Sequence, residues 1–336
     1  MITLNNEKFN DIELSILSFI LLNSFTSTII INLFKEYNTL EIIISLLISF
    51  ILGYPIINYL LKLYKNNYIE NISNSKIIKI IIKILFSISV LIIGIFSLYY
   101  NSTIIKEILL PNNNYMIILI LLLSISVFLA SKGLKSIAIA ANLLFIIFII
   151  VELSSLLFNI PNIDTLNLLP FNNLEKINFN EPLIYSITPL FMLLIIPKNN
   201  IINFNKYKIN LKKAYIIYYI YLIIKIIFIL SILGISYYEI LKFPGITVLK
   251  SISLFNFFER LEEILIINIF IENFILLSLV IYYIKNLFNN KYSLYIISTV
   301  LFLIEIKISY LNNYILIISN TTFIFLNFIT HKRKSI

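Results

Sequence analysis

Residues 136–157 read SIAIAANLLFIIFIIVELSSLL, a stretch in which Glu152 is the one charged residue. A helix rises about 1.5 Å per residue, so about 20 apolar residues cross the roughly 30 Å hydrocarbon core of a bilayer. A helix also satisfies its own backbone hydrogen bonds, which lipid cannot do. The stretch therefore predicts a membrane-spanning helix with an acidic side chain inside the membrane.

Comparable apolar runs recur along the whole chain. The predicted spans lie at residues 14–34, 42–61, 84–105, 115–130, 136–157, 182–196, 214–235, 264–284, 292–304 and 311–330. Of the 336 residues, 60% are hydrophobic and 13% are charged, whereas soluble domains have about 45–50% and about 25%. This composition excludes a soluble domain and predicts an all-α, polytopic membrane protein with about ten transmembrane helices.

The lysines and arginines predict the orientation of these spans. Most of the 26 basic residues fall in every second connection, and the C-terminal tail, residues 331–336, is basic as well. Basic connections stay on the cytoplasmic side of a membrane. We therefore expect a multi-pass protein with both termini inside, and we attribute the net charge of +9 to contact with anionic headgroups rather than to nucleic-acid binding.

The scarcity of reactive residues argues against an enzyme. The chain has no cysteine, and its one histidine, His331, lies in the basic tail. Thiol chemistry and cysteine-ligated metals are therefore excluded, and we expect no metal and no cofactor. A membrane acyltransferase is a remote alternative. Such an enzyme needs a general base, usually histidine, near its thioester substrate, whereas His331 lies in the tail and not in a predicted span.

Two polar interruptions occupy corresponding places in the two halves of the chain. Ten helices divide into repeats at residues 11–157 and 182–330, and an inverted pair of such repeats would give a LeuT-like fold with discontinuous helices 1 and 6. The polar residues of the interruptions are Asn23, Ser24, Thr26, Ser27, Ser186 and Thr188, with Pro189 next to the last. We expect them to line a ligand site near mid-bilayer. The alternative is that they bond to their own backbone or join helices.

Three charged residues lie within predicted spans: Glu152, Lys225 and Glu272. An unpaired charge at such a depth costs about 2.5–3.5 kcal/mol or more. Lys225 and Glu272 have comparable depths on consecutive spans, so we expect these two to pair and Glu152 to reach the nearer interface. The pair would be either structural or part of a site that titrates or binds a ligand ammonium.

Three stretches resemble the B subunits of spore nutrient-germinant receptors, the endospore germination permease family. They are Leu109-Leu110-Pro111 with Lys132-Gly133 after the next span, Asn167-Leu168-Leu169-Pro170, and Pro244-Gly245-Ile246 continuing through Phe257-Phe258-Glu259-Arg260-Leu261-Glu262. Their order and spacing, with the ten spans, extend the resemblance over essentially the whole chain. The sequence departs from the family where Lys135 and Ile139 follow Gly133 and where the first span lacks glycine.

The resemblance implies an amino acid/polyamine/organocation transporter-type fold of two inverted five-helix repeats. It implies a place in the spore inner membrane beside A-type and C-type receptor subunits, and a small nutrient, commonly an amino acid, as ligand. Arg260 and Glu262 belong to the family motif. The alternatives are a freestanding proton-coupled amino-acid permease, with Glu272 or Glu152 as the proton-linked group, and a sparsely polar channel.

Overall fold

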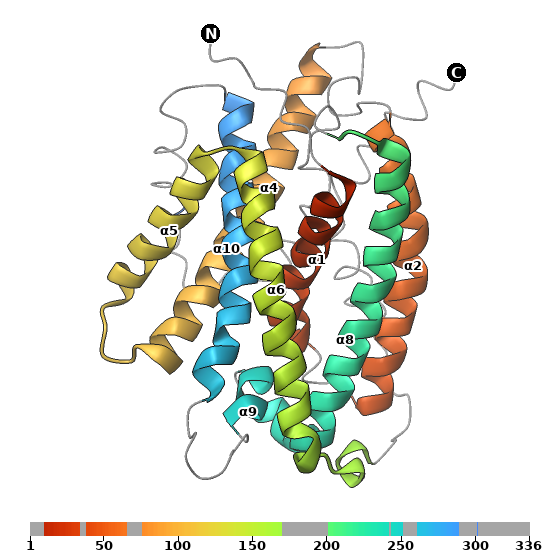
Figure 1. Cartoon of the computed structure of the whole chain (residues 1–336), viewed down its shortest axis with the longest axis vertical. Coiled ribbons are helices and arrows are strands. Elements are labelled where there is room, and N and C mark those ends of the chain that lie inside the picture. The colour runs from red at the N-terminus through yellow and green to blue at the C-terminus, as the bar shows by residue number, and fades with distance from the viewer. Residues whose placement is uncertain are drawn as a thin grey trace.

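The computed structural model describes residues 10–33, 38–65, 76–169, 201–241, 243–250 and 261–288, together with residue 301. The elements in this part of the chain are helices (Figure 1). They are α1 (Asp11–Leu33), α2 (Thr39–Lys65), α4 (Lys76–Ile104) with the π-turn η2 (Ile105–Leu109), α5 (Tyr115–Ser131), α6 (Leu134–Asn159), the 3-10 turns η3 (Ile160–Asn162) and η4 (Thr165–Leu168), α8 (Phe204–Ile240), α9 (Pro244–Lys250) and α10 (Leu261–Phe288).

The predicted spans within the described residues each coincide with one helix. The spans at 14–34, 42–61, 84–105, 115–130, 136–157, 214–235 and 264–284 correspond in order to α1, α2, α4, α5, α6, α8 and α10. Five stretches are long and apolar enough to cross a membrane: Thr39–Lys62, Ser87–Leu109, Leu134–Asn162, Phe204–Ile240 and Ile266–Asn286. In the part of the chain that the structure describes, this confirms an all-helical fold with five helices long and apolar enough to span a membrane. The spans at 182–196, 292–304 and 311–330 lie outside the described residues.

Capping residues and a glycine set the helix boundaries. The side chain of Asn114 accepts a hydrogen bond from the Met116 backbone N–H (3.0 Å) at the start of α5. The side chain of Asn203 accepts one from Lys206 N–H (3.2 Å) at the start of α8. Between α5 and α6, Gly133 has a φ of 100°, a conformation that suits glycine and ends one helix before the next.

The expected interruption of the first span is wrong. The backbone of α1 is helical from Asp11 to Leu33, through the whole polar run. No glycine or proline occurs between these bounds, and the serine hydroxyls satisfy themselves locally: Ser18 donates to Leu14 O (2.7 Å) and Ser24 to Leu21 O (3.0 Å). Such back-bonding is compatible with an unbroken helix. The expected break in the sixth span lies outside the described residues.

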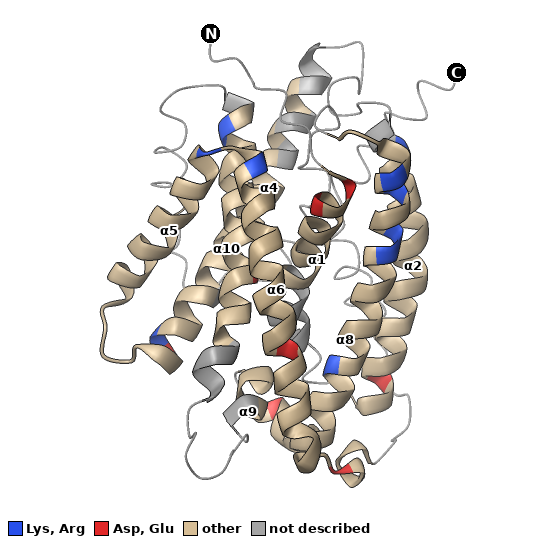
Figure 2. Cartoon of the chain, in the orientation of Figure 1, with Lys and Arg blue, Asp and Glu red and all other residues tan. Residues whose placement is uncertain are grey.

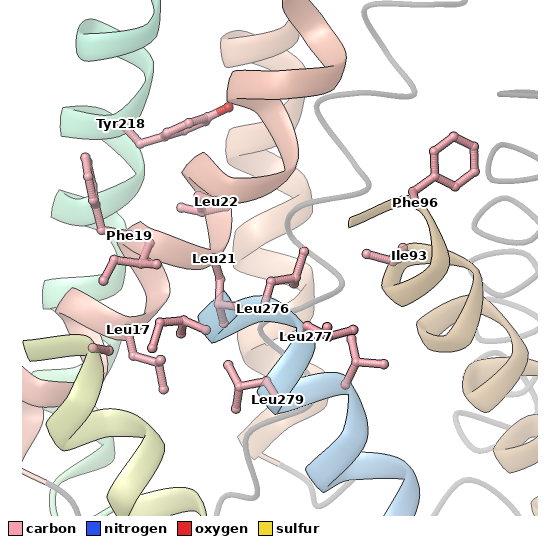
Figure 3. Packing of buried hydrophobic residues seen from close by; sticks show 14 of the residues in the cluster. Leu17, Phe19, Leu21, Leu22, Ile93, Phe96, Tyr218, Leu276, Leu277 and Leu279 are labelled. Atoms are coloured by element: carbon pink, nitrogen blue, oxygen red, sulfur yellow. The ribbon is translucent and has the colours of Figure 1, made fainter. Parts of the chain in front are cut away.

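Helices α1 and α10 form the centre of the bundle. α1 contacts α6, α8 and α10, whereas α10 also contacts α4 and α5, and α2 packs on α8 (Figure 1). Leu17 and Leu21 of α1 are fully buried and lie toward Leu276 and Leu279 of α10 (Figure 3). On the other side, Phe19 meets the ring of Tyr218 of α8 edge-on, with centroids 6.5 Å apart. Contacts with these two helices therefore fix the positions of α4, α5, α6 and α8.

Many of the lysines lie at one end of the bundle. The α5–α6 connection, the N-terminal turns of α8 and the C-terminal end of α10 carry lysine at the same end (Figure 2). In the sequence these are Lys132, Lys135, Lys206, Lys208, Lys212, Lys213 and Lys285. All of these lysines belong to connections that the sequence predicts on the cytoplasmic side of the membrane. The fold places these connections at the same end of the bundle, as the alternation of basic loops predicts.

Two glycines allow close helix contacts. A Cβ on Gly53 of α2 would collide with the hydroxyl of Tyr215 of α8, which donates a hydrogen bond to Phe50 O (3.0 Å). A Cβ on Gly94 of α4 would lie 2.8 Å from Cγ1 of Val280 of α10. Small residues at such points let helices approach in a membrane, where apolar burial does not drive association.

We predict that Gly53→Ala destabilises the protein by about 1–3 kcal/mol, because the added methyl displaces the buried Tyr215 hydroxyl. The Tyr215→Phe change in the same chain removes the colliding oxygen and should restore part of the loss. The midpoint of thermal unfolding in detergent measures both. Ile51→Ala, at a side chain 64% exposed on the same helix, is the control and should change little. Equal stability of Gly53→Ala and the parent would contradict the prediction.

Candidate functional site

A polar network lies where α1, α6, α8 and α10 meet. The Lys225 ammonium on α8 lies 2.9 Å from Glu152 Oε1 on α6 and donates to the Tyr221 hydroxyl at 2.8 Å. Asn23 of α1 donates through Nδ2 to Oε1 of Glu272 on α10. Asn23 and Glu272 are almost completely buried, whereas the Lys225 and Glu152 side chains are 18% and 15% exposed. We call these five residues the polar network.

The partner of Lys225 differs from the expected one. Lys225 forms its ion pair with Glu152, not with Glu272 as its depth in the chain suggested, and Glu152 is a member of the network rather than an interfacial residue. Depth along consecutive spans does not determine which helix faces which. Helix α1 packs against α6, α8 and α10 alike, so the network forms around its buried Asn23.

Tyr221 connects the two halves of the network. It lies one helical turn before Lys225, a spacing that places both on one helix face. The Lys225 ammonium is 5.3 Å from the Tyr221 ring centroid, a cation–π distance. Sequence inspection missed this tyrosine, although its i, i+4 position relative to an intramembrane lysine is the signal that marks it.

The network contains more acidic than basic groups. Among the residues that the structure describes, Lys225 and Glu152 form the one ion pair, and the Glu272 carboxyl is held by the neutral amide of Asn23. The Lys225 ammonium pairs directly with Glu152, and Glu272 is the second carboxyl of the network. An ion buried in a membrane span is costly unless it is paired, so the ion pair and the amide contact stabilise these two carboxyls.

Helix α10 supplies polar partners to three neighbours. Besides Glu272, the side chain of Asn268 donates to Phe148 O of α6 (3.0 Å). The hydroxyl of Ser97 on α4 donates to Oδ1 of Asn273 (3.1 Å). These three residues of α10 are at most 2% exposed, so their hydrogen bonds fix the position of α10 against α1, α4 and α6.

The structure describes the side chains of only some of the predicted ligand residues. Asn23 lies in the network, whereas Ser24 is buried and bonds to its own helix. Thr26 and Ser27 belong to α1, and Glu262 to α10, but their side chains lie outside the described residues, as do Ser186, Thr188 and Arg260 altogether. The structure therefore brings Asn23 together with Glu152, Lys225 and Glu272, a combination that the sequence did not predict.

The described chain has a break in α8 at Gly234, where φ is 69° and ψ is 160°. A helix end leaves its last carbonyls without helical donors. Asn167 of η4 supplies a donor to two of these carbonyls: its Nδ2 donates to Ser231 O (3.0 Å) and to Ile232 O (3.3 Å). The Asp164 backbone N–H donates to Ser231 O as well (3.0 Å). Asn167 thereby gains a structural role that its motif alone did not indicate.

A second motif closes the turn between α4 and α5. The Lys106 ammonium, in the π-turn η2, donates to the carbonyls of Pro111 (2.7 Å) and Asn113. These carbonyls belong to the turn that follows Leu109 and Leu110. Two of the three motif stretches thus stabilise connections at the same end of the bundle, opposite the lysine-rich end (Figure 2).

We predict that Lys225→Met destabilises the protein by about 3–5 kcal/mol, because it leaves two buried carboxylates without an ammonium. Adding Glu152→Gln removes one of those charges and should recover much of the loss. Thermal unfolding in detergent measures both variants. The control is Lys213→Met, the same change at an exposed lysine of α8. A double variant less stable than Lys225→Met would refute the charge balance described above.

The sequence matches the model of the family described as "Spore germination protein" over residues 13–321. No curated protein matches it at significant similarity. The matched region contains all of the described helices except the first two residues of α1, together with the polar network and all three motif stretches. The chain therefore belongs to the spore germination protein family, a family of permeases.

Proposed function

We propose that the chain is the transporter-like membrane subunit of a nutrient-germinant receptor in the spore inner membrane. It binds a small amino acid near mid-bilayer and transmits this event to A-type and C-type subunits. Family membership supports the receptor role. The observation that carries ligand binding is the buried Glu272 carboxyl, which is held by an amide beside a lysine already paired with another glutamate.

The Asn23 amide occupies the place that a ligand ammonium would take. Both groups donate hydrogen bonds to a carboxylate, but an ammonium also carries a positive charge. A charge-assisted hydrogen bond is roughly twice as strong as a neutral one. In our proposal the ammonium of the amino acid displaces Asn23 from Glu272, and this exchange is the binding event.

The ligand carboxylate would bind on the opposite side, to hydroxyls of the first and sixth spans. Thr26, Ser27, Ser186 and Thr188 are the candidates, and Ser24 requires release from Leu21 O to take part. The surrounding spans are apolar, which favours a ligand with a small uncharged side chain. In this proposal the two inverted repeats, ten spans and inside termini of the transporter-type fold provide the frame.

We predict that spores carrying Glu272→Gln need at least tenfold more nutrient for the same rate of germination. The reason is the lost charged hydrogen bond, worth about 1.5–3 kcal/mol. Germination rate against amino-acid concentration measures the effect, with immunoblotting to verify subunit level.

The matched control is Glu107→Gln, the same chemical change at an exposed carboxyl outside the network. Thr188→Val tests the carboxylate side separately and should shift the same curve. If Glu272→Gln spores respond as the parent does at limiting nutrient, the ammonium site is not at Glu272.

A freestanding proton-coupled amino-acid permease is the second candidate. The two intramembrane carboxyls, Glu152 and Glu272, are the observation that favours it, because ionisable groups within spans are typical of proton-coupled transporters. The family is a permease family, and for that reason the acyltransferase alternative is not proposed further.

We predict that labelled amino-acid uptake distinguishes the two functions. Vesicles containing this chain without A-type or C-type subunits should show no accumulation above empty vesicles if the chain acts in a receptor. Uptake driven by an inward proton gradient and abolished by Glu272→Gln would instead assign transport to the isolated chain.

A further inference from the structure

We propose that an aromatic layer centred on Phe19 is a barrier that closes the polar network toward the lysine-rich end of the bundle. The aromatic layer consists of Phe19, Phe145, Phe148, Tyr218 and Tyr221, which come from α1, α6 and α8. These three helices run from the lysine-rich end toward the opposite end (Figures 1 and 2). The barrier itself does not depend on the proposed function.

The Phe19 ring contacts four rings of two neighbouring helices. Its centroid lies 5.6 Å from that of Phe145 and 6.2 Å from that of Phe148, both on α6. It lies 6.5 Å from the centroid of Tyr218 and 6.2 Å from that of Tyr221, both on α8. These distances fall within the range of direct aromatic contact, about 4.5–7 Å. One side chain of α1 therefore joins the rings of α6 to those of α8.

The aromatic layer lies directly beside the polar network. Phe19 precedes Asn23 by four residues on α1, and Phe148 precedes Glu152 by four residues on α6. Each ring therefore lies about one helical turn, roughly 6 Å, nearer to the lysine-rich end than the polar residue of its own helix. Tyr221 belongs to both groups, so no other described side chain is needed to connect them.

Leucines continue the apolar contact on the side of α10. Leu17 and Leu21 of α1 lie toward Leu276 and Leu279 of α10 (Figure 3). These two leucines follow Glu272 by four and seven residues. Because α10 runs in the reverse direction, they lie nearer to the lysine-rich end than Glu272 does (Figure 1). All four leucines are fully buried, so each helix of the network places apolar or aromatic side chains on this side of it.

The other side of the network is polar on two of the same helices. Ser155 and Asn159 follow Glu152 by three and seven residues on α6, and Asn268 precedes Glu272 by four on α10. All three side chains are buried, and Oδ1 of Asn268 has no donor in the part of the chain that the structure describes. A polar solute finds hydrogen-bond partners on this side, whereas it loses them in crossing the aromatic layer, which is costly.

Cysteine labelling tests the barrier, because the chain has no cysteine of its own. Ser155→Cys, a change of similar size, places a thiol seven residues beyond Phe148, about 10 Å further from the lysine-rich end. The probe is methanethiosulfonate ethyltrimethylammonium, a cation that does not cross lipid, added to one face of membrane vesicles at a time. Lys132→Cys at the lysine-rich end and Leu166→Cys in η4 at the opposite end, both at exposed positions, identify the face that each preparation presents.

Phe19→Ala should raise the labelling rate of Ser155→Cys from the lysine-rich end at least tenfold and leave the rate from the opposite end unchanged. Phe19→Leu, which keeps a bulky apolar side chain, should retain most of the barrier. Phe50→Ala is the matched control. Its ring stacks on that of Tyr215, with centroids 5.7 Å apart, and lies outside the aromatic layer, so its loss should change neither rate.

Phe145→Ala removes a second ring that contacts Phe19, and it provides the test if Phe19→Ala does not accumulate. An unchanged rate from the lysine-rich end in the alanine variants of the aromatic layer would overturn the barrier. An equal rise from both ends, or the same rise in Phe50→Ala, would indicate general loosening of the bundle and would overturn it as well.

The barrier has a consequence for the ligand that rests on the proposed function. An amino acid would reach Glu272 from the end opposite the lysines, which the sequence predicts to be external, and would not pass through Phe19. Labelling in vesicles requires no nutrient and no receptor partner. Parental spores that respond to no nutrient would therefore refute the receptor role, while the labelling rates would still decide whether Phe19 closes the network.

Discussion

The ion pair of Lys225 with Glu152 joins two helices that lie far apart in the chain, and it is part of a polar network on which four helices depend. Lipid offers no hydrogen bonds, so each buried polar group must find its partner inside the protein. Asn23 of α1 and Glu272 of α10 meet this condition for each other. The positions of α1, α6, α8 and α10 are consequently determined by polar contacts as much as by the leucine packing around them.

Four of the five glycines lie where a side chain would interfere with the architecture. Gly53 and Gly94 let α2 approach α8 and α4 approach α10. Gly133 and Gly234 adopt positive φ, the first between two helices and the second within one. Long apolar helices otherwise show little to distinguish one face from another, so these positions, with the asparagines of α10, specify which faces meet.

Family membership and the network are the two observations that support our proposed function. The chain belongs to a permease family, and the network places Asn23 and Glu272 in the interior of the bundle. In our proposal, a ligand ammonium exchanges with the Asn23 amide at the Glu272 carboxyl.

The sequence by itself determined that the chain is helical and membrane-spanning, and it located each described helix except the short α9, although α4 and α8 begin eight and ten residues before their predicted spans. Hydrophobic length alone decides these features, and the alternation of lysines predicted which connections lie together. The tertiary structure decided that α1 is unbroken, that Glu152 rather than Glu272 pairs with Lys225, and that α8 is interrupted at Gly234. These depend on which helix faces meet, and near-uniform apolar spans carry too little pattern to specify a face.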